Sequence, residues 1–303
     1  MGVETPGLTS VEPIGVIAYY NLLEALPTDG PGELFRARDT IRGRTVIIRR
    51  LAPVTPTTLR HAIQTSAQAL SALSHPNVIR LFDVGDDEGR LYLVFEHLQG
   101  STLRQELGGR QINVRRAVEL AIQIADAVAE AHAAGYLHAG LSPESVVITA
   151  KGHAKIPAHQ LACREGFVIG AGEPALVDYP SPEEASGLTP DERSDVFSVG
   201  ALLYEMLTAR RPSVKGAARP SATNTNVPRE LDDLVLQAVA PNPAKRYATA
   251  SELVASLRAV LAVIDARTAA DDASVSTSTQ PRSRYVLMGG LRSEEHTSEL
   301  QSH

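Results

Sequence analysis

The chain has 303 residues, of which 43% are hydrophobic and 21% charged, and its 29 basic and 35 acidic side chains leave a net charge of −6. Such a composition supports a sizeable buried core and excludes a chain that is disordered throughout. The acidic balance speaks against nucleic acid as the main partner, and the single cysteine, Cys163, excludes an intramolecular disulfide and a zinc site of several thiolates.

Residues 1–18 are expected to be an N-terminal extension, and they lack the basic start and apolar core of a signal peptide, so we expect a cytoplasmic location. From 19 to 98, short apolar or alternating runs separated by Gly, Asp and Pro predict antiparallel strands. These runs cover 33–38, 45–51, 80–84 and 90–95. Apolar residues at helical spacing predict one helix over 57–73, and Pro76 forbids much continuation.

From 99 to 265 the hydrophobic spacing becomes that of long helices. It predicts helices over 114–134, 194–207, 229–239 and 250–264. Gly135 follows the first of them, where a left-handed C-terminal cap is expected. The pattern therefore predicts an α+β fold of two lobes, a small β-rich lobe with one main helix and a larger helical lobe.

The C-terminal segment divides into two parts. Residues 266–291 hold few large apolar side chains, which predicts a flexible linker, and no stretch of the chain reaches the roughly 20 apolar residues of a membrane span. Residues 292–303 match the conceptual translation of a sequencing adapter, and we interpret them as an assembly artefact. The natural chain would then continue past Leu291. The basic flank 282–284 and the apolar residues after it are how a membrane-spanning helix begins, although a plain apolar stretch in a tail is the simpler interpretation.

Three segments together resemble a known family. They read LSHPNVIRLFDVG at 73–85, HAGLSPESVVIT at 138–149 and YPSPEEASGLTPDERSDVFSVGALLYEMLTARRP at 179–212. In this order and spacing the chain resembles the bacterial branch of the Ser/Thr protein kinases from about 19 to 261. The resemblance implies the bilobal kinase fold, in agreement with the periodicity, but a fold alone does not confer an activity.

The resemblance also implies where catalytic groups would stand. Kinases position ATP with a glycine-rich loop and a strand lysine, hold two Mg²⁺ ions with an Asp and an Asn, and use another Asp as the base. Only the last of the three loop glycines, Gly32, is kept, because Pro27 and Asp29 replace the others. Six further positions carry replacements: Arg49 for the strand lysine, Ser66 for the helix glutamate, Gly140 for the base, Ser142 for the loop lysine, Ser145 for the asparagine and Ala158 for the metal-binding aspartate.

The resemblance also implies which residues would line a nucleotide pocket and which would support the fold. A bound nucleotide, if there is one, would contact Gly32, Leu34, Ile47, Arg49, Phe95, Glu96 and Leu98. The scaffold positions are Leu70, Phe82, His138 and His159 in a spine that links the lobes, Asp195 beneath the catalytic loop, and the pair Glu183 and Arg246. No metal site is expected.

We therefore expect a catalytically inactive protein-kinase-like domain, a pseudokinase, that acts as a signalling scaffold or allosteric partner without a cofactor. One alternative is a Ser/Thr protein kinase with weak or unconventional phosphotransfer, which would use ATP and Mg²⁺. Another is the cytoplasmic part of a truncated membrane receptor kinase. The expected partners are proteins, either a kinase or a phosphopeptide-binding module that reads the Ser/Thr cluster 274–279, which is otherwise a plain spacer. A membrane partner is expected only if the chain continues past Leu291.

Overall fold

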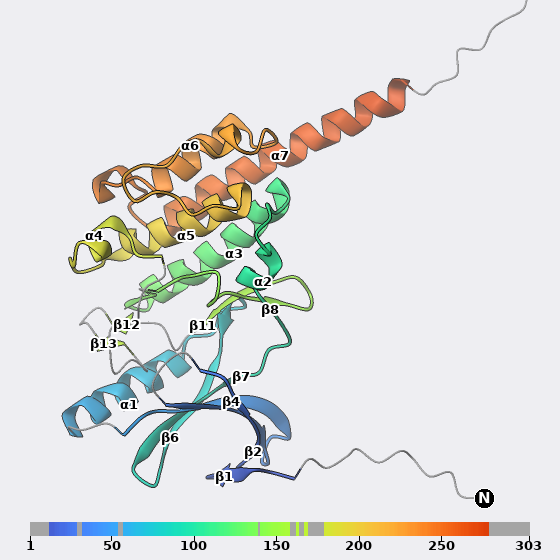
Figure 1. The fold of residues 1–303 in the computed structure, drawn as a ribbon. Coiled ribbons are helices and arrows are strands. Elements are labelled where there is room, and N and C mark those ends of the chain that lie inside the picture. The colour runs from blue at the N-terminus through green and yellow to red at the C-terminus, as the bar shows by residue number, and fades with distance from the viewer. Residues whose placement is uncertain are drawn as a thin grey trace, which may run out of the picture. The chain divides into compact units, whose positions relative to one another are not determined.

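The N-terminal part of the chain folds into an antiparallel sheet (Figure 1). The computed structural model describes residues 12–28, 32–53, 57–138, 140–157, 162–163, 167–168 and 179–278. Within these residues the sheet has the order β1 (Gly15–Ile17), β2 (Tyr20–Leu26), β3 (Glu33–Asp39), β4 (Arg44–Arg50), β7 (Arg90–Glu96) and β6 (Leu81–Asp87). The predicted strands are thus confirmed. The predicted extension 1–18 ends too late, because β1 pairs with β2 and belongs to the sheet.

The two faces of this sheet bury different side chains, because successive residues of a strand point to opposite sides. Val46 and Ile48 of β4 are fully buried in a cluster on one face. Ile47, between them, packs against the large core that also holds residues of α1 (Thr57–Ser71). Arg49 is two residues from Ile47, so the strand alternation places it on the same face as Ile47.

Phe82 does not take the core position that was predicted for it beside Leu70. Leu70 is 1% exposed and Leu81 is 2% exposed, and both belong to the large core. Phe82 is half-buried and packs instead against the cluster on the other face of the sheet. The pairing of β6 with β7 shifts between Leu81 and Asp83, so Phe82 lies at a β-bulge, and a bulge changes the direction of the side chain at that position. His159, the fourth predicted spine member, lies outside the described residues.

Helices make up most of the C-terminal lobe (Figure 1). In the described part of the chain they are α2 (Leu103–Leu107), α3 (Val114–Ala133), α4 (Pro182–Ala185), α5 (Glu192–Thr208), α6 (Arg229–Ala238) and α7 (Ala250–Ser278), with short 3-10 turns at Pro220–Ala222 and Pro243–Lys245. From Ser194 to Thr208, α5 is buried at every position because it packs against both α3 and α6. A Cβ atom on Gly200 would lie 2.7 Å from the Cβ of Ala238, so glycine is what lets α5 and α6 approach.

Two small sheets of short strands flank the loop that contains the candidate site. One small sheet has the order β5 (Val78–Ile79), β11 (Ala154–Pro157), β10 (Val147–Thr149) and β8 (Gly100–Thr102), and another has the order β13 (Phe167–Val168), β12 (Ala162–Cys163) and β9 (Tyr136–Leu137). The loop between β9 and β10 holds the segment 138–146, which carries most of the candidate site. Gly135 follows Ala134, the C-cap residue of α3, and has a φ of +85°, as the predicted left-handed cap requires.

The last helix is longer than the sequence predicted. We expected a helix over 250–264 and a flexible linker from 266, whereas α7 continues to Ser278. Among its described side chains, Ile264 is the last apolar one that packs against the large core, and residues 266–270 are exposed. Alanines at 266, 269, 270 and 273 have the highest helix propensity of any residue, so the helix persists without an apolar face. No helix among the described residues is both long and apolar enough to span a membrane. The predicted adapter segment 292–303 and the apolar residues before it lie outside those residues.

Candidate active site

Gly32 and Arg49 belong to neighbouring parts of the N-terminal sheet, Gly32 just before β3 and Arg49 on β4. Gly32 precedes β3 with a φ of +105°, and a Cβ atom there would lie 2.5 Å from the backbone oxygen of Arg50. Only glycine fits this position. Arg49 lies opposite Leu34 of β3 and Leu93 of β7. Burial lowers the pKa of its guanidinium. Since the arginine fork is larger than an ammonium group and binds with a different geometry, it does not reproduce a lysine at a tight phosphate site.

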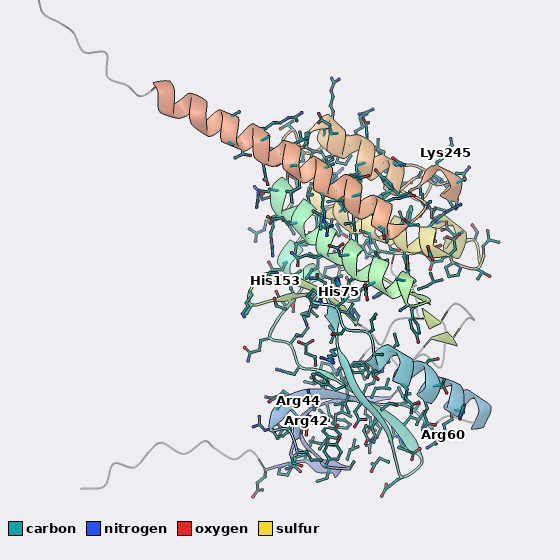
Figure 2. All side chains as sticks on the ribbon, turned by 180° about the vertical axis from the view of Figure 1, so that it is seen from behind. Arg42, Arg44, Arg60, His75, His153 and Lys245 are labelled. Carbon is teal, nitrogen blue, oxygen red and sulfur yellow. The ribbon has the colours of Figure 1, made fainter. Side chains whose placement is uncertain are left out.

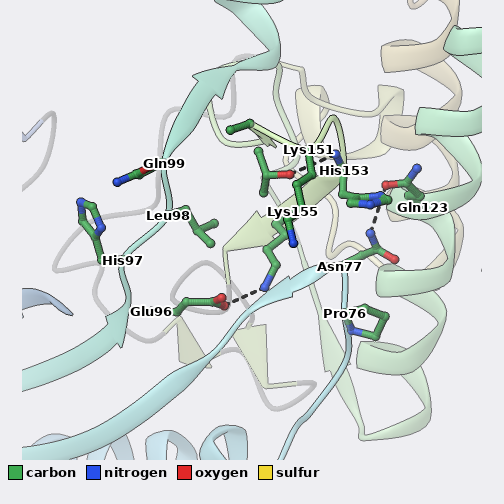
Figure 3. A pocket seen from close by; sticks show the side chains of 12 residues that line it. Pro76, Asn77, Glu96, His97, Leu98, Gln99, Gln123, Lys151, His153 and Lys155 are labelled. Atoms are coloured by element: carbon green, nitrogen blue, oxygen red, sulfur yellow. Dashed lines mark hydrogen bonds and ion pairs between the residues drawn. The ribbon is translucent and has the colours of Figure 1, made fainter. Parts of the chain in front are cut away.

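Residues of the segment that joins the two lobes line a cavity. Phe95 lies opposite Ile47 and is buried in the core. Glu96 and Leu98 line a pocket of about 740 Å³, where Glu96 forms a 2.7 Å ion pair with Lys155 (Figure 3). The other lining residues are Pro76, Asn77, His97, Gln99, Gln123, Thr149, Ala150, Lys151 and His153. The other residues predicted for a nucleotide, namely Gly32, Leu34, Ile47, Arg49 and Phe95, are not among the lining residues of this pocket.

The loop that would carry the catalytic base carries none. Gly140 has no side chain, and a Cβ atom there would have the oxygen of His138, 3.9 Å away, as its nearest heavy atom. Space for a side chain therefore exists. Ser142 and Ser145 hydrogen-bond to each other: the hydroxyl of Ser145 donates to the Ser142 carbonyl at 2.9 Å and accepts from the Ser142 amide at 3.0 Å. Ser66, at the position of the helix glutamate, is half-buried on α1.

The donor set does not fit the pair of Mg²⁺ ions that the resemblance implies. Magnesium is bound through carboxylates and other hard oxygen ligands in near-octahedral geometry. Ser145 offers a neutral hydroxyl whose hydrogen is already donated within the loop. Ala158, which lies outside the described residues, has no ligand atom in its side chain. The described residues also contain no group of three or more His, Cys, Asp or Glu side chains that could hold a metal ion.

A buried carboxylate holds the catalytic loop from below. Oδ2 of Asp195 accepts the backbone amide of His138 at 2.8 Å and lies 2.8 Å from Nε2 of His132. The ring of His138 is fully buried, and this burial lowers its pKa to about 4 although Asp195 acts in the opposite direction. His132 was missed in the sequence, where the only signal was a histidine on the apolar side of the last turn of α3.

Glu183 and Arg246, which were predicted to pair, form an ion pair within the C-terminal lobe. Nη1 and Nη2 of Arg246 donate to the two oxygens of Glu183 at 2.6 and 2.7 Å, and the Arg246 side chain is fully buried. The hydroxyl of Ser194 donates to the same carboxylate at 2.7 Å. Burial opposes ionisation of Glu183, but these bonds outweigh it and lower its pKa to about 2.

A second charged cluster joins α2 to the catalytic loop and was not predicted. Arg104 donates to Glu144 at 2.6 Å, to Glu205 at 2.6 Å and to the hydroxyl of Tyr179 at 2.7 Å. Tyr179 also donates to Glu205, and burial together with this bond raises its pKa to about 12. Residues 40 to 101 positions from Arg104 in the chain meet here, which no local pattern could indicate.

Comparison with known proteins shows the family to which the chain belongs. Residues 20–257 match the family model described as the protein kinase domain. The chain belongs to the protein kinase family. Similar proteins include the serine/threonine-protein kinase PknB of Mycolicibacterium smegmatis, 32% identical over 268 residues that cover 78% of this chain and 42% of PknB. Serine/threonine-protein kinase Pkn3 of Myxococcus xanthus is 32% identical over 291 residues, which cover 80% of this chain and 50% of Pkn3.

The protein kinase fold is also found by comparison with solved structures. The kinase domain of Mycobacterium tuberculosis PknI matches with a TM-score of 0.65 at 21% identity, over 83% of this chain and 98% of that domain. This similarity concerns the fold alone. The chain spans about two fifths of the length of the curated relatives that it matches first. The predicted family and the bilobal fold are thus confirmed.

Proposed function

We propose that this member of the protein kinase family is a noncatalytic signalling domain, a pseudokinase that binds protein partners as a scaffold or allosteric component. The observation that supports this most directly is Gly140. A general base must reach the proton that it removes, and glycine has no side chain with which to do so. Ser145, five residues further along the chain, uses its hydroxyl within the loop itself.

The residues that hold the fold support the same proposal. The carboxylate of Asp195 and the ion pair of Glu183 and Arg246 keep the loop and the α4 segment in place. Loss of one transition-state group already costs orders of magnitude in rate, and several such groups are replaced together here. A surface kept in shape without the reacting groups suits binding.

A second candidate is ATP-dependent Ser/Thr phosphotransfer of a weak or unconventional kind. The similar proteins favour this candidate over the first, because PknB and Pkn3 are both named serine/threonine-protein kinases. It would require ATP and Mg²⁺, with Arg49 as the positive group on the strand. Glu144 or Glu165 would have to supply the carboxylate that Gly140 and Ala158 lack.

One transfer assay separates the two candidates. The purified chain is incubated with labelled ATP and Mg²⁺ or Mn²⁺, and label on the chain itself and on a general Ser/Thr substrate is counted. The comparison is a variant in which four of the family's residues are restored, Arg49→Lys with Gly140→Asp, Ser145→Asn and Ala158→Asp. Our proposal predicts label with the restored variant and none with the natural chain. Label from the natural chain that disappears in Arg49→Ala would establish the second candidate instead.

A further inference from the structure

Three arginine side chains meet at a small pocket of the N-terminal lobe, away from the catalytic loop. The pocket measures about 260 Å³ and is lined by Arg42, Arg44, Ser71, Arg80, Leu81 and Phe82. We call it the arginine pocket. Figure 2 shows two of its members, Arg42 and Arg44, beside each other on the sheet. Arg42 belongs to the turn between β3 and β4, Arg44 begins β4, and Arg80 directly precedes β6.

Arg44 is held in one orientation. Its guanidinium carbon lies 3.4 Å from the centre of the Phe82 ring, and its Nε donates to Oδ2 of Asp39 at 3.3 Å. The side chain is 33% exposed, so part of it still faces solvent. Stacking on an aromatic ring fixes the plane of a guanidinium, which lowers the entropy lost when it binds a ligand.

The carboxylate of Asp39 cannot neutralise all three arginines. Asp39 is fully buried, and its Oδ1 accepts the backbone amides of Ile41 at 3.1 Å and Arg42 at 2.9 Å. Burial opposes its ionisation, but these amides and Arg44 hold its pKa below the usual value, so it carries one negative charge at neutral pH. The guanidinium of Arg42 remains 3.9 Å from this carboxylate.

Other nearby charges leave the excess intact. The exposed side chain of Arg80 makes no ion pair with any residue that the structure describes. The carboxylate of Glu96, which accepts the Arg80 amide at 3.4 Å, is paired with Lys155. Three guanidinium groups therefore face one carboxylate, which leaves an excess of two positive charges around the pocket.

We infer that the arginine pocket binds the phosphate of a phosphorylated serine or threonine side chain from a protein partner. Such a phosphate carries about −1.5 to −2 charges at neutral pH, which matches the excess, and arginine forks bind its oxygens in pairs. The volume lies below the range of about 300–1,000 Å³ that holds a whole small ligand, so it suits one group at the end of a larger molecule. Ser71 is not a donor to the phosphate, because its hydroxyl donates to the carbonyl of Gln68 at 2.7 Å.

An exposed apolar side chain beside the pocket favours a polypeptide over a free anion. Ile41 precedes Arg42 in the same turn and is 70% exposed. A peptide whose phosphate enters the arginine pocket extends over this turn and removes Ile41 from water, which inorganic phosphate cannot do. The site is independent of the proposed function, since it uses neither Arg49 nor the catalytic loop.

The test measures retention of the full chain on immobilised peptides. The probe is a mixed-sequence library with a fixed phosphothreonine, and the same library with unmodified threonine or with glutamate is the comparison. We expect retention on the phosphorylated library alone. Arg80→Gln should weaken it about tenfold, and Arg44→Lys, which keeps the charge but loses the fork, should weaken it as well. Arg229→Gln removes one charge from an exposed position of α6 and should change nothing.

The variant Ile41→Ser distinguishes the phosphate of a peptide from free inorganic phosphate. It should weaken retention on the phosphorylated library but leave competition by inorganic phosphate unchanged. Equal retention on all three libraries would overturn the inference, as would an effect of Arg229→Gln equal to that of Arg80→Gln. Binding of inorganic phosphate without retention of the chain would overturn the protein partner. Sedimentation with phosphatidylglycerol vesicles in place of retention, lost in Arg80→Gln, would do the same by assigning the pocket to a membrane surface.

Discussion

The hydroxyl of Ser145 donates its hydrogen bond to the backbone carbonyl of Ser142, 2.9 Å away, at the position where the protein kinase family has an asparagine that binds metal. The same hydroxyl accepts the Ser142 amide. The side chain thus closes a turn of the loop between β9 and β10 and has no hydrogen left to donate. At this position of the catalytic loop, the side chain of Ser145 therefore stabilises the loop's own backbone.

This use of Ser145 leads to a prediction about nucleotide and magnesium. A ligand that binds only the folded state at 100 times its Kd adds about 2.7 kcal/mol of stability, which raises the Tm by about 4–5 °C for a chain of this size. Thermal unfolding of the chain with ATP should therefore show no additional increase when Mg²⁺ is present. The variant with Arg49→Lys, Gly140→Asp, Ser145→Asn and Ala158→Asp is the comparison. A Tm of the natural chain that rises only when both ATP and Mg²⁺ are present would contradict our assignment.

The ion pair between Glu183 and Arg246 predicts a loss of stability in acid. The pKa of Glu183 falls from an ordinary 4.5 to about 2 in the folded chain, so the unfolded chain binds this proton first as the pH drops. The contribution of the pair is complete above pH 4.5 and is lost between about 4.5 and 2. Glu183→Gln leaves the buried Arg246 without its carboxylate and should cost about 3–5 kcal/mol of unfolding free energy.

Glu24→Gln is the matched control for that measurement. Glu24 pairs with Arg36 on the sheet, but the two side chains are 52% and 40% exposed, so solvent screens the pair. The variant should change the unfolding free energy by less than about 1 kcal/mol in denaturant titrations at pH 7. A cost for Glu183→Gln no larger than this would show that the buried pair does not hold α4.

The buried ring of His138 predicts a second, separate pH range. Its pKa is lowered from 6.5 to about 4, because burial disfavours the charged ring. Between these values the unfolded chain binds the proton and the folded chain does not, so stability should decrease as the pH falls from about 6.5 to 4. His138→Phe should remove part of this slope when unfolding free energy is measured across the range. His153→Gln, at an exposed position, should keep it, and an unchanged slope in His138→Phe would refute the prediction.

The exchange of roles between Leu81 and Phe82 can be measured by truncation. Leu81→Ala removes a side chain that is 2% exposed in the large core and should cost about 2–5 kcal/mol. Phe82→Ala removes a larger but half-buried ring from the other face and should cost less. Denaturant unfolding of both variants decides the order. A greater cost for Phe82→Ala would restore the position that the sequence alone predicted for it.

The sequence by itself determined the family, the two lobes and most element positions. These features follow from local patterns in the chain: the periodicity of strands and helices, the Gly and Pro residues between them, and motifs such as 138–149. Each pattern depends only on residues that are close in the sequence, so it can be recognised without the structure. The replacements Arg49, Gly140 and Ser145 were equally visible, because a missing functional group is a property of the residue itself. The continuation of α7 to Ser278 was missed, since alanine propensity acts without an apolar pattern.

Only the tertiary structure decided which side chains meet. The choice between Leu81 and Phe82 depends on the strand register, which shifts between Leu81 and Asp83. Arg104 contacts Glu144, Tyr179 and Glu205 from 40 to 101 residues away. Arg80, which precedes β6, meets Arg42 and Arg44 of the hairpin between β3 and β4. Charges far apart in the chain are brought within a few ångströms by core packing, and one-dimensional spacing contains no information about that distance.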